Sequence, residues 1–210
     1  SQSILKDHPV NQRRIARGLR PATSIWLWGQ GKKPQIDSFS HKYGLSGATI
    51  SAVDLIKGLG ICAGLEAIEV PGATGNIHTN FKGKAEATIE AFRKGKDFIY
   101  LHFEAADEAG HRGEIENKVL AIEKIDAEVL GPILSELPHI DPEFRILILP
   151  DHPTPLAIKT HTADPVPYLI YDSTSKINSG IESFDESSAA QTLSFVAEGH
   201  RLMDRFILND

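Results

Sequence analysis

Residues 145–171 read RILILPDHPTPLAIKTHTADPVPYLIY, and the rest of the chain is organised around this stretch. It opens with an apolar run, residues 146–149, whose length is typical of a buried strand. A second apolar run closes it at residues 168–171. Because Pro153 and Pro155 exclude a helix between the two runs, we expect a stiff loop there.

This loop carries three side chains of the kinds that bind metals. Asp151 and His152 follow the first apolar run at once, and His161 comes nine residues after His152. A carboxylate and two imidazoles, held at the end of a strand by prolines, are suited to a divalent metal ion. The competing interpretation is an ordinary loop with surface histidines.

Strands and helices alternate along the rest of the chain. Strands are expected at residues 23–28, 67–70, 97–103 and 145–149. Helical spacing of apolar residues predicts helices within 47–65 (Ile50, Val53, Ile56, Leu59), at 84–94, from about 113 to 137, from 187 to about 198, and at 201–208. This alternation is the signature of a doubly wound α/β sheet that is mostly parallel, and ligands collect at the carboxyl ends of its strands.

A second pair of possible ligands follows the strand expected at 97–103. Asp107 and His111 are four residues apart, so on one helical turn both side chains point the same way. His161 could complete a three-ligand site with them, while Asp151 and His152 could serve a second metal ion. Mixed oxygen and nitrogen ligands favour Mn²⁺ or Zn²⁺ over Ca²⁺, which prefers oxygen alone.

The other histidines fall into two groups. His102 lies at an alternating position of the strand expected at 97–103. We expect it either in the core or in contact with a ligand residue without binding the metal itself. Four others have no ligand type beside them, and we expect them at the surface: His8, His41, His139 and His200.

Candidate substrate contacts are Gln30, Lys32 and Lys57. The first two belong to a glycine-bracketed loop, residues 29–34, and such a loop can approach an anion closely, although a plain turn has the same sequence. Lys57 lies among apolar residues, where it is either a surface lysine or a phosphate contact.

Composition excludes several classes of protein. The 210 residues fit one domain or a large part of one, and 41% apolar and 24% charged residues are typical of soluble globular proteins. A net charge of −6 argues against nucleic-acid binding. No apolar run approaches the roughly 20 residues that span a bilayer, so no membrane partner is expected. A single cysteine, Cys62, allows no internal disulfide and suits the cytoplasm.

Several motifs together resemble one enzyme family. The most specific are HFEAADEAGHRGE (102–114), LPDHPTP (149–155) and KTHTADPVPYLIY (159–171). Further similar blocks lie at 22–31, 51–60 and 70–75. The chain resembles the cofactor-independent (2,3-bisphosphoglycerate-independent) phosphoglycerate mutases of archaeal type, which belong to the alkaline phosphatase superfamily of binuclear metalloenzymes.

The resemblance implies an alkaline-phosphatase-like fold with two divalent metal ions, Mn²⁺ first and Zn²⁺ or Mg²⁺ as alternatives. One metal site takes Asp107, His111 and His161. The other takes Asp151 and His152, with an aspartate and a serine from the family's N-terminal part. The serine accepts the phosphoryl group of 3-phosphoglycerate and returns it to the other hydroxyl, which yields 2-phosphoglycerate in glycolysis and gluconeogenesis.

The chain departs from the family pattern in two respects. No segment supplies the family's N-terminal half, so residues 1–20 are expected to be a connecting segment from that half and residues 21–210 the C-terminal part of the metalloenzyme domain. The chain also starts at Ser1 without a methionine. We therefore expect a fragment that holds no nucleophile and is inactive without its missing half. The second departure is His78, which stands where the family has an acid.

Three other functions compete with the mutase. Another phosphomutase or a phosphatase of the same superfamily would use the same metal ligands on a different substrate. A non-catalytic relative would keep the fold as a binding module. A nucleotide-binding α/β domain is opposed by the lack of a G-x-G-x-x-G or Walker motif.

Overall fold

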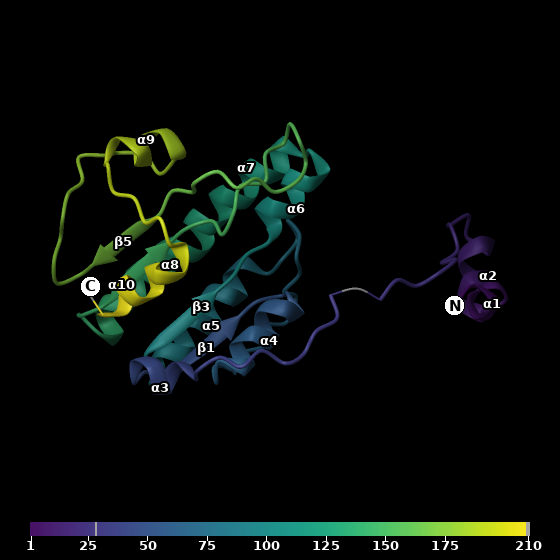
Figure 1. Ribbon diagram of the computed structural model, residues 1–210, viewed down its shortest axis with the longest axis horizontal. Coiled ribbons are helices and arrows are strands. Elements are labelled where there is room, and N and C mark those ends of the chain that lie inside the picture. The colour runs from purple at the N-terminus through teal and green to yellow at the C-terminus, as the bar shows by residue number, and fades with distance from the viewer. Residues whose placement is uncertain (28, 209–210) are drawn as a thin grey trace. The chain divides into compact units, whose positions relative to one another are not determined.

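The protein is described by a computed structural model that covers residues 1–27 and 29–208 (Figure 1). The chain divides into two compact units, Ser1–Gln35 and Ile36–Asp210. Within the described ranges, no helix combines the length and the apolar character that crossing a bilayer requires.

The smaller unit consists of two short helices and the extended chain that follows them. Helix α1 (Gln2–Lys6) is followed by α2 (Pro9–Ala16), which begins at Pro9. Asn11 of α2 is buried, and its side chain bonds the main chain of Ala22 in both directions: Nδ2 donates to the carbonyl (2.8 Å), and Oδ1 accepts from the amide (2.9 Å). One asparagine therefore fastens the extended chain to the helix.

The strand predicted at residues 23–28 is wrong for residues 23–27, which have no regular secondary structure, and Trp28 lies outside the described residues. The side chains of Trp26 and Leu27 are 85% and 84% exposed. A strand forms only when a neighbouring strand pairs with its backbone, and the smaller unit has none in its described part.

The larger unit is built on a parallel sheet. Its strands are β1 (Gly47–Ile50), β2 (Glu66–Ala67) and β3 (Phe98–Leu101), paired in the order β2-β1-β3. Helix α4 (Asp54–Cys62) packs on β1 and β2, and α5 (Phe81–Arg93) packs on β3 and β1. The predicted α/β class with a parallel sheet is confirmed, and β2 is shorter than the strand expected at 67–70.

One helix prediction was wrong in its first part. Ile50 belongs to β1 and is fully buried, and α4 begins only at Asp54. A four-residue strand that is buried along its whole length has no alternating polar positions, so its apolar residues blend into the helical spacing that follows.

A long helical run forms the core with α5. It consists of α7 (Ile115–Lys124), a π-helical segment η1 (Ile125–Leu130) and α8 (Gly131–Ile140), which lie end to end (Figure 1). The run extends three residues beyond the predicted end at 137. Its inner face packs against α5 and the start of α6, the helix described below, and the buried residues of this core are Phe81, Ala85, Ile89, Ala105, Ala121, Val129, Ile133 and Leu137.

Strand β4 (Arg145–Ile148) was expected to extend the parallel sheet, and it does not. It pairs in antiparallel fashion with β5 (Leu169–Asp172), which corresponds to the second apolar run. Arg145 and Asp172 face each other in this ladder and form an ion pair of 2.6 Å between Nε and Oδ2. The order of strands in a sequence does not determine which edge a strand joins, and here the cross-strand partner decides it.

The remaining helices are short: α3 (Phe39–Tyr43), α6 (Ala105–Arg112), α9 (Glu186–Gln191), the 3-10 turn η2 (Gly199–Arg201) and α10 (Leu202–Leu208). Asp185 caps the start of α9 by accepting from the amide of Ser188. The helix ends well before the predicted residue 198, because Leu193 adopts a positive φ of 57°.

Candidate metal centre

Helix α6 follows directly after β3 and presents two of the predicted ligands. Asp107 and His111 are one turn apart on it, so their side chains lie on the same face. Gly113 ends the helix in the left-handed conformation (φ 72°), and α7 then leads the chain away. This places both side chains at the carboxyl edge of the parallel sheet, where α/β proteins bind their ligands.

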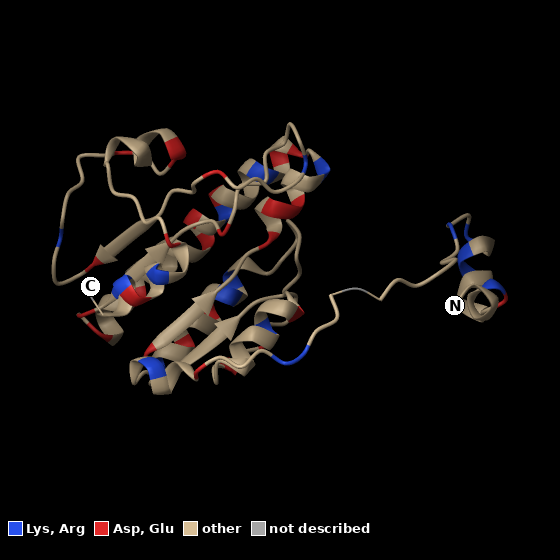
Figure 2. Cartoon of the chain, viewed as in Figure 1, with Lys and Arg blue, Asp and Glu red and all other residues tan. Residues whose placement is uncertain are grey.

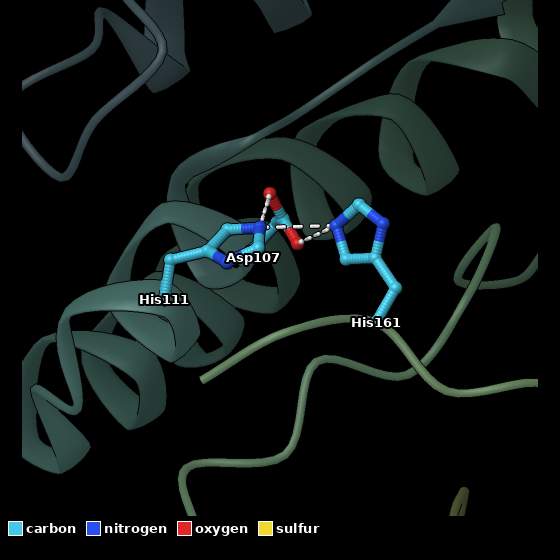
Figure 3. Close-up of side chains that lie close together, drawn as sticks. All are labelled: Asp107, His111 and His161. Carbon is cyan, nitrogen blue, oxygen red and sulfur yellow. Dashed lines mark hydrogen bonds and ion pairs between the residues drawn. The ribbon is translucent and has the colours of Figure 1, made fainter. Parts of the chain in front are cut away.

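His161 comes to the same point from the loop after β4. Its Nε2 atom lies 3.3 Å from Oδ1 of Asp107 and 3.0 Å from Nε2 of His111. The distance from His111 Nε2 to Asp107 Oδ2 is 3.4 Å. Figure 3 shows the carboxylate between the two imidazole rings, and the ligand atoms of the three residues all lie within 4.8 Å of one another.

These distances match the spacing of atoms around one metal ion. Ligand atoms that bind zinc tetrahedrally at about 2.0–2.1 Å lie about 3.3 Å from each other. The donor set of two imidazole nitrogens and one carboxylate is also of the kind that transition metals prefer. The three residues are therefore close enough together to hold a divalent metal ion.

The tautomer of His111 is determined by the main chain. Its Nδ1 atom lies 3.0 Å from the carbonyl oxygen of Lys159, an atom that can only accept a hydrogen bond. Nδ1 therefore carries the proton, and Nε2 keeps its lone pair for a metal ion, as is usual for metal-binding histidines. Lys159 has a positive φ of 54°, a conformation rare for a residue with a side chain.

Thr154, on the loop after β4, contacts one of the candidate ligands. It is 4% exposed, and its hydroxyl donates to Oδ1 of Asp107. Its carbonyl accepts from Nζ of Lys118 on α7, at 2.9 Å. Thr154 thereby connects the loop after β4 to α6 and α7, and it orients the carboxylate.

Gly110 allows this loop to approach α6. A Cβ atom at this position would lie 2.6 Å from the carbonyl oxygen of Thr154. We therefore predict that Gly110→Ala lowers the free energy of unfolding by about 1–3 kcal/mol, as overpacking does. Urea unfolding measures the change. Gly58→Ala is the matched control: Gly58 is in α4 with open space around it, so the change there should stabilise by about 0.5–1 kcal/mol. Equal effects of the two changes would contradict the role of Gly110.

Asp151 and His152 lie beside this cluster. His152 Nε2 is 3.3 Å from Asp151 Oδ2, again the spacing of two ligand atoms. The ring of His152 packs on that of His161 with 3.6 Å between centroids, and its Nδ1 lies 3.4 Å from the Thr154 hydroxyl. The structure thus brings all five predicted ligands to one region.

The region is acidic. Figure 2 shows acidic residues on α6 and on the chain that leads into it. Burial raises the pKa of Glu104, and the negative charges of Glu108 and Asp107 raise it further. Carboxylates gathered in this way repel one another, so a bound cation would relieve the repulsion.

The candidate substrate residues are placed less favourably. Nζ of Lys57 lies 2.8 Å from both carboxylate oxygens of Glu69 and is engaged in that ion pair. Gln30 and Lys32 belong to the smaller unit and stay predictions. His78 is exposed in the loop before α5, where its amide donates to Asn76 Oδ1 (2.9 Å).

Sequence reasoning missed Thr154, Gly110 and the Lys159 carbonyl. The residues Pro153 and Pro155 around Thr154 indicated a stiff loop, but not which side chain it directs to Asp107. Every residue has a main-chain carbonyl, so the residue type does not show which carbonyl accepts a hydrogen bond, and nothing in the sequence pointed to Lys159.

Comparisons with known proteins show the family to which the chain belongs. The family model described as the metalloenzyme superfamily matches residues 7–204. A probable 2,3-bisphosphoglycerate-independent phosphoglycerate mutase of Geobacter sulfurreducens is 50% identical, covering 99% of this chain and 51% of the relative. The 2,3-bisphosphoglycerate-independent phosphoglycerate mutase of Methanosarcina acetivorans is 53% identical, covering 90% of this chain and 47% of the relative.

Two solved structures also match this chain. A protein of Pyrococcus horikoshii superposes with a TM-score of 0.77 at 34% identity, over 90% of this chain and 49% of that one. The cofactor-independent phosphoglycerate mutase of Thermoplasma acidophilum gives 0.62 at 26% identity, over 99% and 48%. The chain spans about half the length of the curated relatives it matches, and the resemblance stated from its motifs is confirmed.

Proposed function

Because the chain belongs to the metalloenzyme superfamily, we propose that it supplies the main metal-binding part of a 2,3-bisphosphoglycerate-independent phosphoglycerate mutase. The observation that carries the proposal is the pair of imidazole Nε2 atoms 3.0 Å apart. The Lys159 carbonyl leaves His111 Nε2 with a bare lone pair. When His161 also presents a lone pair at Nε2, the two nitrogens can bind one cation, and the Asp107 carboxylate completes the set.

We propose that Asp107, His111 and His161 hold one divalent ion, and that Asp151 and His152 contribute to a second. The ions would supply positive charge that neutralises phosphoryl oxygens. The mixed donors favour Mn²⁺, with Zn²⁺ or Mg²⁺ as alternatives. Thr154 holds the Asp107 carboxylate in its orientation, and the Lys159 carbonyl directs Nε2 of His111 toward the ion by accepting from Nδ1.

The reaction also needs a nucleophile. We propose a serine from the part of the relatives that this chain does not match. Its hydroxyl oxygen would form a bond to the phosphorus of 3-phosphoglycerate as the bond to the 3-oxygen breaks. The 2-hydroxyl would then take the phosphoryl group back from the serine, which gives 2-phosphoglycerate. A glycolytic role and a cytoplasmic setting are parts of the same proposal.

Complementation tests this function. We predict that the chain with Mn²⁺ does not convert 3-phosphoglycerate, and that conversion appears when it is joined to the part of the Geobacter sulfurreducens relative that it does not match. The Asp107→Asn version of the joined protein is the control and should be inactive. Turnover by the chain alone would refute the proposed division of the site.

The same joined protein distinguishes the mutase from a phosphatase. His78, in place of the acid of the family pattern, is the feature that favours another substrate. Hydrolysis of a generic phosphomonoester is therefore measured beside mutase turnover. If hydrolysis is faster than isomerisation, the mutase proposal fails, and a phosphatase on the same metal ligands replaces it.

A further inference from the structure

Ser51 and His102 form a polar pair at the same sheet edge as the metal centre. Ser51 follows β1, and its Oγ lies 3.2 Å from Nδ1 of His102, which follows β3. The amide of His102 donates to the carbonyl of Ile50 (2.9 Å), so the two strands stay in register up to this pair. Neither residue is among the five ligands.

The hydrogen bonds of Ser51 determine the tautomer of His102. Ser51 is 3% exposed, and its Oγ accepts from the amide of Val53 at 3.0 Å. The hydroxyl proton needs an acceptor because the group is buried. Among the described residues, Nδ1 of His102 is the acceptor within reach. Ser51 therefore donates to Nδ1, and the ring proton is on Nε2.

Nε2 points away from β1, because the two ring nitrogens face nearly opposite directions. Burial lowers the pKa of His102, so the ring is neutral near pH 7. The charged groups that act on it are Asp151, Lys84, Asp107 and His152. Three of these are candidate ligands from both metal sites, so the imidazole lies within electrostatic reach of both. No hydrogen bond to Nε2 is present within the described part of the chain.

We propose that His102 is a substrate-binding residue, whose Nε2–H donates to a phosphoryl oxygen at the metal centre, and that Ser51 is the positioning residue that keeps the proton there. The inference rests on the proposed function. A nitrogen that carries a proton cannot ligate a metal ion, but it can donate to an anion. Among the carboxylates of this edge, a neutral donor adds specificity for phosphate without adding a charge.

The tautomer is tested without metal or substrate. The chain is labelled with ¹⁵N-histidine, and long-range ¹H–¹⁵N correlation spectra identify the protonated nitrogen of His102. We expect the proton on Nε2 in the wild type and a mixture of tautomers in Ser51→Ala. A wild-type ring that carries its proton on Nδ1 would overturn the inference, whatever the chain's function.

Anion binding is tested with two variants that keep different halves of the imidazole. The amide nitrogen of His102→Gln occupies the place of Nε2, and that of His102→Asn the place of Nδ1. Inorganic phosphate is titrated into the Mn²⁺-loaded chain by calorimetry. We expect His102→Asn to bind phosphate about 10-fold more weakly, as loss of one hydrogen bond implies, and His102→Gln to stay near the wild type. Mn²⁺ affinity should be the same in all three.

The outcomes separate this inference from the proposed function. If the wild type binds phosphate and His102→Asn binds it equally well, the role of His102 fails while the function stands. A loss of Mn²⁺ affinity in His102→Asn would show support of the metal instead, and would also overturn the anion role. If the Mn²⁺-loaded wild type binds no phosphate, the anion role fails, the complementation experiment still decides the proposed function, and the NMR result still decides the role of Ser51.

Discussion

Replacing Asp107 with asparagine is expected to weaken the binding of Mn²⁺ and Zn²⁺ by at least about 100-fold. Losing a residue that only hydrogen-bonds to a metal ligand typically costs about 10–100-fold, and losing a ligand should cost more. The carboxylate lies 3.3 and 3.4 Å from the nearest nitrogens of His161 and His111, and it supplies the only negative charge of the three-residue cluster. The substituted amide keeps the shape of the side chain but removes that charge. Isothermal titration of the chain with each metal measures the loss.

Asp164→Asn is the matched control for this change. Asp164 is exposed on the loop that carries His161, and the substitution removes the same charge. We expect its metal affinity to equal that of the wild type. Thermal unfolding gives a second readout, because a ligand at 100 times its Kd stabilises the folded state by about 2.7 kcal/mol. If Asp107→Asn gains as much stability from Mn²⁺ as the wild type does, these three residues are not the metal site.

Raising the pH from about 8 to 10.5 is expected to increase the contribution of Lys84 to stability by about 3 kcal/mol. Lys84 is 1% exposed on α5, its Nζ donates to the carbonyl of His102 at 2.9 Å, and it lies 4.4 Å from the centroid of the Phe103 ring. Burial lowers the pKa of Lys84 from 10.5 to about 8, although the negative charge of Glu104 acts to raise it.

The direction of the effect follows from proton binding. Between pH 8 and 10.5 the unfolded chain holds a proton on Lys84 that the folded chain releases. Stability therefore rises with pH in this window, and below pH 8 this group adds no pH dependence. Lys84→Met removes the titrating group, so the difference in unfolding free energy between wild type and variant should change by about 3 kcal/mol across the window.

Urea unfolding at several pH values between about 7 and 10.5 measures this difference. Lys82→Met is the control, because Lys82 lies on the same helix with an exposed side chain. Its stability curve should run parallel to that of the wild type. Parallel curves for Lys84→Met as well would show that the buried ammonium keeps its ordinary affinity for the proton.

The positions of the candidate metal ligands could be predicted from the sequence better than the pairing of the strands. Helical spacing alone places Asp107 and His111 on one face of a helix, and the end of an apolar strand places Asp151 and His152. Each pair is therefore positioned by residues next to it in the sequence. Strand pairing is not local. The partner of β4 could not be inferred from its own residues. The strand predicted at 23–28 is rich in strand-forming residue types, but within the described part of the smaller unit no strand pairs with it.

Burial of polar side chains was equally hidden. Lys84 stands in KAEATIEAFRK, a pattern in which a lysine marks the solvent face of a helix. It is buried because the end of β3 offers it a carbonyl and an aromatic ring, and both come from a segment about eighteen residues away. The Ser51–His102 bond likewise joins residues that are far apart in the chain.

The acceptor that orients His111 has a consequence for mutational scanning. Every residue type except proline could present the same carbonyl at position 159, and glycine or asparagine would adopt its positive φ with less strain. An alanine scan would therefore rank Lys159 among silent positions, although its peptide group holds the imidazole in place. Only an edit of the backbone, such as replacing the following amide with an ester to weaken the carbonyl as an acceptor, would make that contribution measurable.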